Sequence, residues 1–307
     1  MSLVIKTLFW IFFSLVFLFF IALISLDIAS TRRLDTVIST LETTDIETYH
    51  TTTVDDLVVA YRTWGDPSNP PIILLHGFLG SSYDYRYLGP KLEENYYIVA
   101  LDLIGFGHSD KPETFTYTNA AHAAFVHRVL ETLQIKQYIL IGHSMSGDIA
   151  LRHAALEQTT VTQLVLIAPA GLSGGPPRTL SPFFYDNIFK NYYLQRIGFN
   201  SVHHQSEYQT AEYFDPMVYF TAQIPSETLR AFSENTDEQS VTDLFSVIQV
   251  PTLIIFGEED TWISPDNGFI FEESLENATL HLVQDTGHMP MIENLSSWMQ
   301  ILKDFLQ

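Results

Sequence analysis

The sequence predicts an α/β fold with a mostly parallel, twisted sheet and helices on both of its faces. Two observations lead to this prediction. Short apolar runs bounded by Gly and Pro alternate with helix-length segments, and strands buried on both faces have such continuous apolar sequences. This alternation favours parallel strands joined by helical crossovers. The expected strands are Leu57–Thr63, Pro71–Leu75, Tyr97–Asp102, Tyr138–Ile141, Gln163–Ala168, Thr252–Phe256 and Thr279–Val283, and the clearest helices are Ala120–Leu133 and Gly147–Leu156.

The N-terminus carries a different pattern. The segment Leu8–Leu26 contains no charged side chain, and its only polar residues are Ser14 and Ser25. A helix of this length, at ~1.5 Å per residue, covers the hydrocarbon core of a bilayer, which is about 30 Å thick. We therefore predict one transmembrane helix within residues 1–30, which would make the protein a single-pass membrane protein.

Two other interpretations of this apolar segment agree less well with the sequence. A cleaved signal peptide has an apolar region of about 7–15 residues and small residues before its cleavage site. The best cleavage site here, around Ala29, has Asp27 where a small residue is preferred. A buried helix of a globular domain would show an amphipathic face, and no such face is visible. The length of the apolar run favours an uncleaved anchor.

The charges beside the anchor leave its orientation nearly undecided. Lys6 precedes it, whereas Arg32 and Arg33 follow it, so the positive-inside rule gives a tie. The very short N-terminal flank leans toward an N-terminus inside the cell and an extracytoplasmic domain. Residues 31–50 are polar and rich in Thr, and we predict that they form a linker that lifts the domain off the membrane.

A second segment interrupts the alternation of strands and helices. Residues 171–249 give no strand signal, and their aromatic side chains recur at near-helical spacing. The sheet already has its own helices, so this insertion is predicted to be a helical cap, or lid, over a pocket. The α/β core would then consist of residues 51–170 and 250–307.

The composition excludes several classes of function. Asp and Glu number 36 against 15 Lys and Arg, and such an acidic surface repels phosphate backbones, so a nucleic-acid partner is not expected. The absence of Cys excludes disulfides and thiolate chemistry. The pair His203–His204 has no carboxylate at metal-ligand spacing and is interpreted as cap packing, so no metal site is expected.

The strongest motif is YILIGHSMSG, Tyr138–Gly147. A strand followed by a tight turn and a helix is the context of a nucleophile elbow, in which the turn exposes one hydroxyl, here that of Ser144. The residues two before and two after the nucleophile must be small so that strand and helix can approach. Gly142 and Ser146 meet this requirement, although Ser146 stands where Gly is usual. His143 is adjacent, but successive residues at such a turn point apart.

A Ser hydroxyl becomes a good nucleophile when a nearby base removes its proton. His288 is the predicted base, because it follows the last expected strand and precedes the C-terminal helical segment. The base needs an acid that orients it and stabilises its charged form. Asp260, in the loop after the previous strand, is the predicted acid, whereas Glu258 and Glu259 are interpreted as solvated loop charges.

Backbone N–H groups suit the stabilisation of an oxyanion because they are fixed in place before the reaction. The segment Pro71–Gly80, PIILLHGFLG, is a strand that leads into a Gly-containing loop. We predict oxyanion donors at the N–H groups of Phe78 and Met145. His76 and Gly77 are expected to shape the loop and not to react.

Five segments in order, HGFLGSSYDY, ALDLIGFGHSDKP, GHSMSG, FGEEDTW and DTGHMPMIEN, resemble the α/β-hydrolase superfamily, and the resemblance extends from about Asp55 to the C-terminus. The order Ser144, Asp260, His288 is the one expected of this fold. The cap and the Pro169–Leu172 segment are similar to monoacylglycerol lipase-like and esterase-like serine hydrolases. This resemblance implies hydrolysis of carboxylic esters through an acyl-enzyme, with water as second substrate and no cofactor.

The leading hypothesis is therefore a lipase or carboxylesterase that acts on a small-molecule or lipid ester and reaches the membrane through its N-terminal helix. One alternative is a carbon–carbon bond hydrolase of ring-cleavage products, which uses the same triad under a similar cap. Another is a non-catalytic binding protein with this fold. Haloalkane dehalogenases and epoxide hydrolases carry Asp at the nucleophile position, so Ser144 argues against both.

Overall fold

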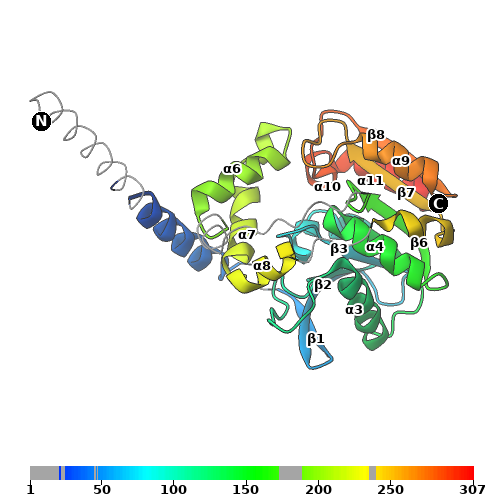
Figure 1. Ribbon diagram of the computed structural model, residues 1–307, viewed down its shortest axis with the longest axis horizontal. Coiled ribbons are helices and arrows are strands. Elements are labelled where there is room, and N and C mark those ends of the chain that lie inside the picture. Colours follow the sequence, from blue (N-terminus) through cyan, green and yellow to red (C-terminus); the bar gives the residue numbers. More distant parts are fainter. Residues whose placement is uncertain (1–20, 22–24, 45, 47, 173–188, 235–239) are drawn as a thin grey trace, which may run out of the picture.

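A computed structural model of the protein describes residues 21, 25–44, 46, 48–172, 189–234 and 240–307. Eight strands form one sheet in the order β1-β2-β4-β3-β5-β6-β7-β8 (Figure 1). β2 is antiparallel to both of its neighbours, and from β4 to β8 all neighbouring strands are parallel. The strands are β1 (His50–Val54), β2 (Leu57–Trp64), β3 (Pro71–Leu75), β4 (Tyr97–Leu101), β5 (Tyr138–His143), β6 (Val161–Ile167), β7 (Thr252–Gly257) and β8 (Ala278–Val283).

The predicted α/β fold is thus confirmed, and each of the seven expected strands is present with small differences at its ends. Helices alternate with the parallel strands, as in the predicted α3 and α4. The α-helices that follow β1 are α2 (Gly89–Leu92), α3 (Asn119–Thr132), α4 (Met145–Leu156), α6 (Tyr192–Val202), α7 (Ala211–Ala222), α8 (Ser226–Glu234), α9 (Asp266–Ser274), α10 (Pro290–Glu293) and α11 (Leu295–Phe305). Short 3-10 helices are η2 (Ser82–Tyr85), η3 (Ser206–Tyr208) and η4 (Val241–Val247).

The edge strand β1 was not expected from the sequence. It reads HTTTV and is mostly exposed or half-buried. Because it pairs with β2 alone at the edge of the sheet, it needs no continuous apolar run. Thr has a good strand propensity, but this short polar segment lacks the apolar run that predicts the other strands.

The sheet separates two apolar layers. Successive side chains of a strand point to opposite faces, and β3 shows this directly. Ile73 and Leu75 belong to the core that includes α3, α4 and α9, whereas Ile72 and Leu74 belong to the core that includes residues of α10 and α11. The sheet is therefore covered on both faces, and its functional groups must lie at a strand end.

The first part of the predicted linker 31–50 is helical. Residues 25–41 are helical, and Leu34, Val37, Ile38 and Leu41 repeat at the spacing of one helix face. This face packs against α6 and α7, and Val37 is 3% exposed. In Figure 1 these cap helices lie between the N-terminal helix and the sheet. The N-terminal helix is therefore docked on the cap.

The cap region is helical where it is described. Residues 189–234 and 240–249 form α6, α7, α8, η3 and η4, and the described part of 171–249 contains no strand. The exact domain boundaries stay a prediction. Among the described residues, no helix combines the length and apolar character needed to cross a membrane. Most of the predicted anchor Leu8–Leu26 lies outside those residues.

Candidate active site

The backbone at Ser144 forms the predicted sharp turn between β5 and α4. Its φ and ψ are 54° and −117°, a combination that costs a non-glycine residue ~1–3 kcal/mol. The turn is held by hydrogen bonds on both sides. The Ser144 N–H donates to the Ile167 carbonyl at 2.9 Å, and the Ser144 carbonyl accepts from the N–H groups of Gly147 at 2.8 Å and Ala170 at 2.9 Å. Neighbouring strand and helix therefore stabilise this strained backbone.

Two glycines let the elbow close. A Cβ on Gly142 would lie 2.2 Å from the Ser146 carbonyl oxygen and 2.8 Å from the Ala150 Cβ. A Cβ on Gly147 would lie 2.4 Å from the Pro169 Cβ. Ser146, which stands where Gly is usual, is fully buried, and its hydroxyl donates to the His76 carbonyl. The extra hydroxyl thus links the elbow to the end of β3, and the elbow forms with Ser at this position.

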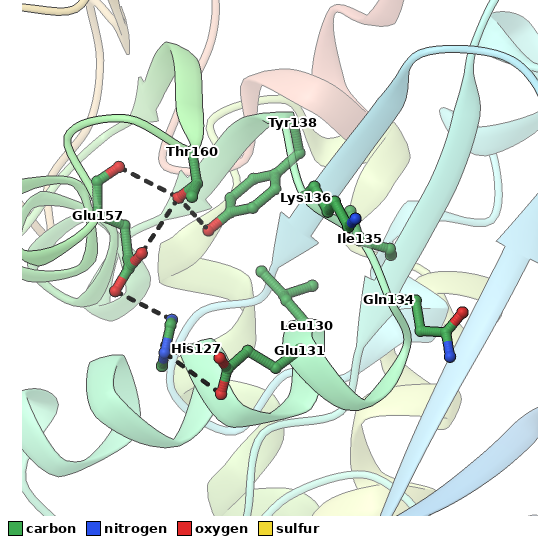
Figure 2. A pocket seen from close by; sticks show the side chains of 9 residues that line it. All are labelled: His127, Leu130, Glu131, Gln134, Ile135, Lys136, Tyr138, Glu157 and Thr160. Atoms are coloured by element: carbon green, nitrogen blue, oxygen red, sulfur yellow. Dashed lines mark hydrogen bonds and ion pairs between the residues drawn. The ribbon is translucent and has the colours of Figure 1, made fainter.

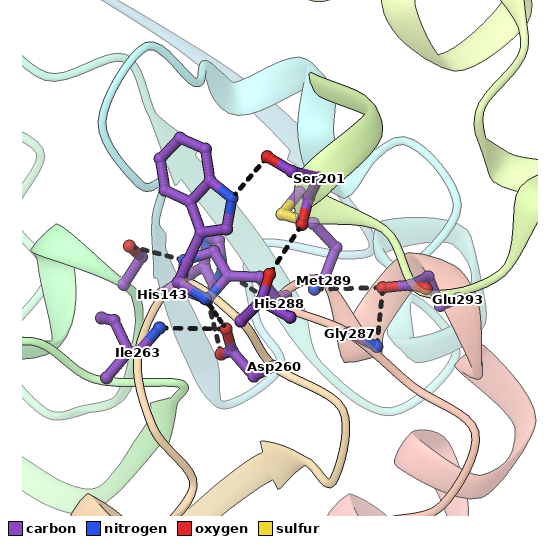
Figure 3. Close-up of polar contacts among 11 residues, drawn as sticks. His143, Ser201, Asp260, Ile263, Gly287, His288, Met289 and Glu293 are labelled. Carbon is purple, nitrogen blue, oxygen red and sulfur yellow. Dashed lines mark hydrogen bonds and ion pairs between the residues drawn. The ribbon is translucent and has the colours of Figure 1, made fainter. Parts of the chain in front are cut away.

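The structure brings the three predicted triad residues together. The Nε2 atom of His288 lies 2.9 Å from the Ser144 Oγ, and its Nδ1 lies 2.6 Å from Oδ2 of Asp260. The other oxygen of Asp260 accepts from the N–H groups of Trp262 at 2.8 Å and Ile263 at 3.0 Å. Figure 3 shows Asp260 below the His288 ring with these contacts. The carboxylate is fully satisfied, so its orientation toward His288 is fixed.

The other two acidic residues of the loop lie elsewhere. Glu258 is exposed. Glu259 is half-buried, and its carboxylate accepts from the Thr286 N–H at 2.8 Å. The geometry therefore assigns the partner of His288 to Asp260, as the sequence predicts.

His143 has a structural role that the sequence did not reveal. Burial, followed by the nearby His288, lowers the pKa of His143 well below its usual value. The ring is therefore neutral, and its Nε2 lies 2.9 Å from the His288 carbonyl oxygen. Since a carbonyl can accept but not donate, Nε2 carries the proton. His143 thus holds the backbone of His288 and does not compete for the Ser144 proton.

The predicted oxyanion donors lie on two segments that meet at Ser144. Met145 is the first residue of α4, where no intrahelical carbonyl is available for its N–H. The Gly80 N–H donates to the Gly77 carbonyl at 3.0 Å and closes the turn around Phe78. A Cβ on Gly77 would lie 3.2 Å from the Ser144 Cβ. The loop that carries Phe78 therefore approaches Ser144 closely.

Aromatic rings line the approach to this loop. The Phe78 side chain is 38% exposed. Its ring centroid lies 5.8 Å from that of Phe106, 6.3 Å from that of Phe189 and 5.6 Å from that of Phe232. Phe189 and Phe232 belong to the cap region, whereas Phe106 belongs to the core. Core and cap together thus form an apolar wall next to the predicted oxyanion donors.

Three ligating side chains that are distant in sequence meet near the triad. One atom each of His204, Glu259 and Asp285 lie within 4.8 Å of one another. His204 and Asp285 are exposed, and such groups commonly gather without an ion. Because the three residues are far apart in the sequence, their spacing along the chain does not predict this contact. The trio is geometrically able to hold a cation, but we assign none to it.

A pocket of about 400 Å³ lies away from the triad (Figure 2). Tyr138, which starts β5, lines it, whereas Ser144 follows the other end of that strand. Within it, His127 lies 3.0 Å from Glu157 and 3.4 Å from Glu131. The pocket therefore lies at the opposite end of β5 and contributes nothing to the site at Ser144.

Comparisons with known proteins agree with this architecture. A family model for the alpha/beta hydrolase fold matches residues 70–295. Uncharacterized hydrolase YugF of Bacillus subtilis (strain 168) is 30% identical over 268 residues, which cover 83% of this chain and 96% of the relative. Lipase 1 of Psychrobacter immobilis is 26% identical over 280 residues, which cover 85% of this chain and 84% of the relative.

A solved structure extends the similarity. The crystal structure of a membrane phospholipase A, described as a bacterial virulence factor, superimposes with a TM-score of 0.75 at 26% identity and covers 96% of this chain and 97% of its own. The match of the family model and the similarity to YugF each span most of the chain. The protein therefore belongs to the α/β-hydrolase fold family, with lipases among its relatives.

Proposed function

We propose that this protein is a serine hydrolase that cleaves carboxylic esters through an acyl-enzyme on Ser144. The observation that carries the proposal is the unbroken hydrogen-bonded series from Ser144 through His288 to Asp260. A hydroxyl, an imidazole and a carboxylate in this order form the arrangement that activates a serine nucleophile. The reaction needs no cofactor, because water is the second substrate.

The first half of the reaction transfers the acyl group to the enzyme. Nε2 of His288 takes the proton from Ser144 as Oγ forms a bond to the ester carbonyl carbon. The carbonyl oxygen then carries the negative charge, and the N–H groups of Phe78 and Met145 stabilise it. Collapse of this intermediate breaks the carbon–oxygen bond of the ester. The alcohol leaves with the proton from His288, and Asp260 stabilises the imidazolium while it exists.

The second half regenerates the enzyme by the same groups. His288 takes a proton from a water molecule, and the water oxygen attacks the acyl carbon. The oxyanion forms again at Phe78 and Met145. Its collapse breaks the bond to Ser144 Oγ, which recovers a proton from His288. The carboxylic acid is released, so the sum of the two halves is one ester and one water giving one alcohol and one acid.

The expected substrates have medium or long acyl chains. The aromatic wall of Phe78, Phe106, Phe189 and Phe232 lies beside the predicted oxyanion donors, where the acyl chain of a bound ester begins. Burial of such a chain against these rings is favourable by ~0.8 kcal/mol for each buried methylene group. The relationship to Lipase 1 supports the same class of substrate.

We further propose that Leu8–Leu26 anchors the enzyme in a membrane and that its catalytic domain lies on the extracytoplasmic side. The support is the apolar sequence itself. The side chains of Leu26 and Ile28, at the start of the helix over residues 25–41, are also exposed. The protein should stay in the membrane fraction after an alkaline carbonate wash. Extraction by that wash would contradict the anchor without affecting the chemistry proposed for Ser144.

The test of the enzymatic proposal is covalent labelling followed by turnover. A fluorophosphonate probe should label the wild-type protein, and Ser144→Ala should remove the label and lower kcat by about four to six orders of magnitude. Hydrolysis of p-nitrophenyl esters and monoacylglycerols of graded chain length should then favour medium or long chains. A wild-type protein that does not react with the probe contradicts the proposal. Cleavage of ring-cleavage products with no ester turnover would favour the carbon–carbon hydrolase instead.

A further inference from the structure

The end of cap helix α6 is bound directly to the loops that carry the triad. We call residues Ser201–Gln205 the cap clamp. The Val202 carbonyl accepts from the His288 N–H at 2.9 Å. Ser201 accepts twice from the acid loop, at its carbonyl from the Thr261 hydroxyl at 3.1 Å and at its Oγ from the Trp262 Nε1 at 3.0 Å. The backbone of the base and the loop of the acid are thus both attached to the cap.

Glu293 joins the same segments from the other side. It is the last residue of α10 and is 2% exposed. Its Oε2 accepts from the N–H groups of His204 at 2.7 Å and Gln205 at 3.1 Å, both in the cap clamp. Its Oε1 accepts from the N–H groups of Gly287 at 3.0 Å and Met289 at 3.4 Å, on either side of His288. Figure 3 shows this carboxylate next to Gly287 and Met289.

The contact between cap clamp and His288 loop is tight. A Cβ on Gly287 would lie 2.7 Å from the His204 nitrogen, 2.7 Å from the Val202 carbonyl oxygen and 2.9 Å from Glu293 Oε1. The two backbones can therefore approach to this distance because residue 287 has no side chain. Neither segment can shift against the other without losing a hydrogen bond to the Glu293 carboxylate.

A buried carboxylate is retained here against a cost. Burial raises the pKa of Glu293, and the backbone N–H donors act in the opposite direction. An unpaired polar group in such a place would be costly, and four N–H donors on one carboxylate offset part of that cost. With these four bonds, one side chain sets the relative position of the cap clamp and the residues that flank the base.

We infer that Glu293 is a positioning residue that couples the cap to the imidazole of His288. The inference rests on the function proposed above, since it assigns Glu293 a role in that same site. Glu293 does not touch the substrate or the reacting atoms. It fixes the peptide groups on both sides of His288, and a displacement of reacting groups by ~1 Å can cost about 100-fold in rate.

Glu293→Gln tests this coupling with the least change of shape. A glutamine offers one acceptor oxygen and turns its NH₂ group toward backbone donors, so one pair of N–H groups loses its acceptor. We expect kcat for a short p-nitrophenyl ester to fall about 100-fold, with KM changed less than about threefold. Labelling by a fluorophosphonate should slow by a similar factor. The proton NMR signal of the His288 Nδ1–H, which reports its bond to Asp260, should shift or broaden.

Glu259→Gln is the matched control. Glu259 also accepts from a backbone N–H of the same loop, that of Thr286 at 2.8 Å, but no hydrogen bond joins it to the cap clamp. Its kcat, labelling rate and NMR signal should stay close to those of the wild type. A folded Glu293→Gln protein with wild-type kcat and an unchanged His288 signal would overturn the inference. Equal losses in both variants would also overturn it, because the effect would then come from the loop and not from the cap.

A second pair of variants tests the donor side of the contact with Glu293. Gln205 has φ −83° and ψ 126°, which are close to the values that proline adopts. Gln205→Pro removes the N–H that donates to Glu293, and Gln205→Ala removes only the side chain, which donates to the Asp285 carbonyl at 2.5 Å. The proline variant should have the lower kcat, by about tenfold for the lost charge-assisted hydrogen bond. Equal activity of the two would contradict the coupling even if Glu293→Gln failed to fold. Failure of wild-type labelling, in contrast, would contradict the proposed function itself.

Discussion

Ser144 and His288 are held in position in different ways. The turn at Ser144 is fixed by the strand before it, the helix after it and the neighbouring strand β6, all within the α/β core. The loop at His288 is fixed by His143 from the elbow and by Val202 from the cap. The position of Ser144, the proposed nucleophile, therefore depends on the core alone, whereas that of His288, its proposed base, depends on core and cap together.

This difference separates two properties of the site. Changes in the elbow should affect the stability of the fold and the reactivity of Ser144 together, because the same backbone forms the sheet and the turn. Changes in the loops around the base should affect the rate with little effect on the core. Substitutions in the two regions can therefore test this separation.

Asp260→Asn should lower kcat by about 10⁴, because an asparagine favours the wrong tautomer of His288 while leaving the shape of the site intact. Unfolding by denaturant should show little change. Glu258→Gln is the control, since Glu258 is exposed in the same loop, and its kcat should equal that of the wild type. Near-normal activity of Asp260→Asn would move the orienting role to another carboxylate.

Gly142→Ala should destabilise the protein and the elbow together. Its Cβ would meet the Ser146 carbonyl oxygen at 2.2 Å, and strain of this kind in a packed core costs ~1–3 kcal/mol or more. Gly198→Ala is the matched control, because nothing lies within 4 Å of a Cβ at that position in α6. That change should stabilise by ~0.5–1 kcal/mol, since Gly weakens a helix interior. Free energies of unfolding measured in urea compare the two, and equal stabilities would show that the elbow tolerates a side chain.

His203 should make the cap clamp sensitive to acid. Burial lowers the pKa of His203 to about 4, whereas an unfolded His has a pKa of ~6.5. Between these values the unfolded chain binds a proton that the folded chain does not, so stability is present above pH ~6.5 and falls as the pH falls toward 4. The wild type should lose up to ~1.4 kcal/mol per pH unit more than His203→Gln in this window.

The control for this titration is His281→Gln, because His281 is an exposed residue of β8. Its free energy of unfolding should follow the pH dependence of the wild type. A His203→Gln protein with the same pH dependence as the wild type would show that this buried ring contributes nothing to acid sensitivity.

Arg33→Gln should have the smallest effect. Arg33 lies 3.1 Å from Asp215, with the two side chains 40% and 19% exposed, and ion pairs exposed to solvent contribute ~0–1 kcal/mol. The unfolding free energy should fall by less than 1 kcal/mol, and kcat should stay unchanged. A large loss of activity would mean that the N-terminal helix acts on the triad through the cap, which would remove the separation between the two regions.

The fold was predictable from local patterns, and the two elements that the sequence did not predict have a common feature. The parallel strands are buried on both faces, so their apolar runs are visible in the sequence. β1 and the helix over residues 25–41 are polar on at least one side, so neither has a continuous apolar run. Leu34, Val37, Ile38 and Leu41 did carry a helical spacing, which a search for periodicity in place of composition would have found.

The proximity of Ser144, Asp260 and His288 was predictable because these residues lie in motifs at strand ends. The cap clamp was not, because its contacts to Glu293 and His288 are made by backbone N–H and carbonyl groups. Every residue except proline has both groups, so contacts of this kind do not restrict which side chain stands at a position. Glu293 itself could have been singled out only as an acid that directly follows the apolar residues Met289–Ile292.

The docked N-terminal helix has a practical consequence for producing the enzyme without its apolar segment. A truncation that starts at β1 would leave Tyr192, Phe199 and Phe214 without the cover of Val37. Contiguous apolar surface of this kind promotes aggregation. A truncation that starts near Leu26 keeps this cover and the bond from the Tyr192 N–H to Ser30. The longer form should therefore be the one that is monodisperse in gel filtration.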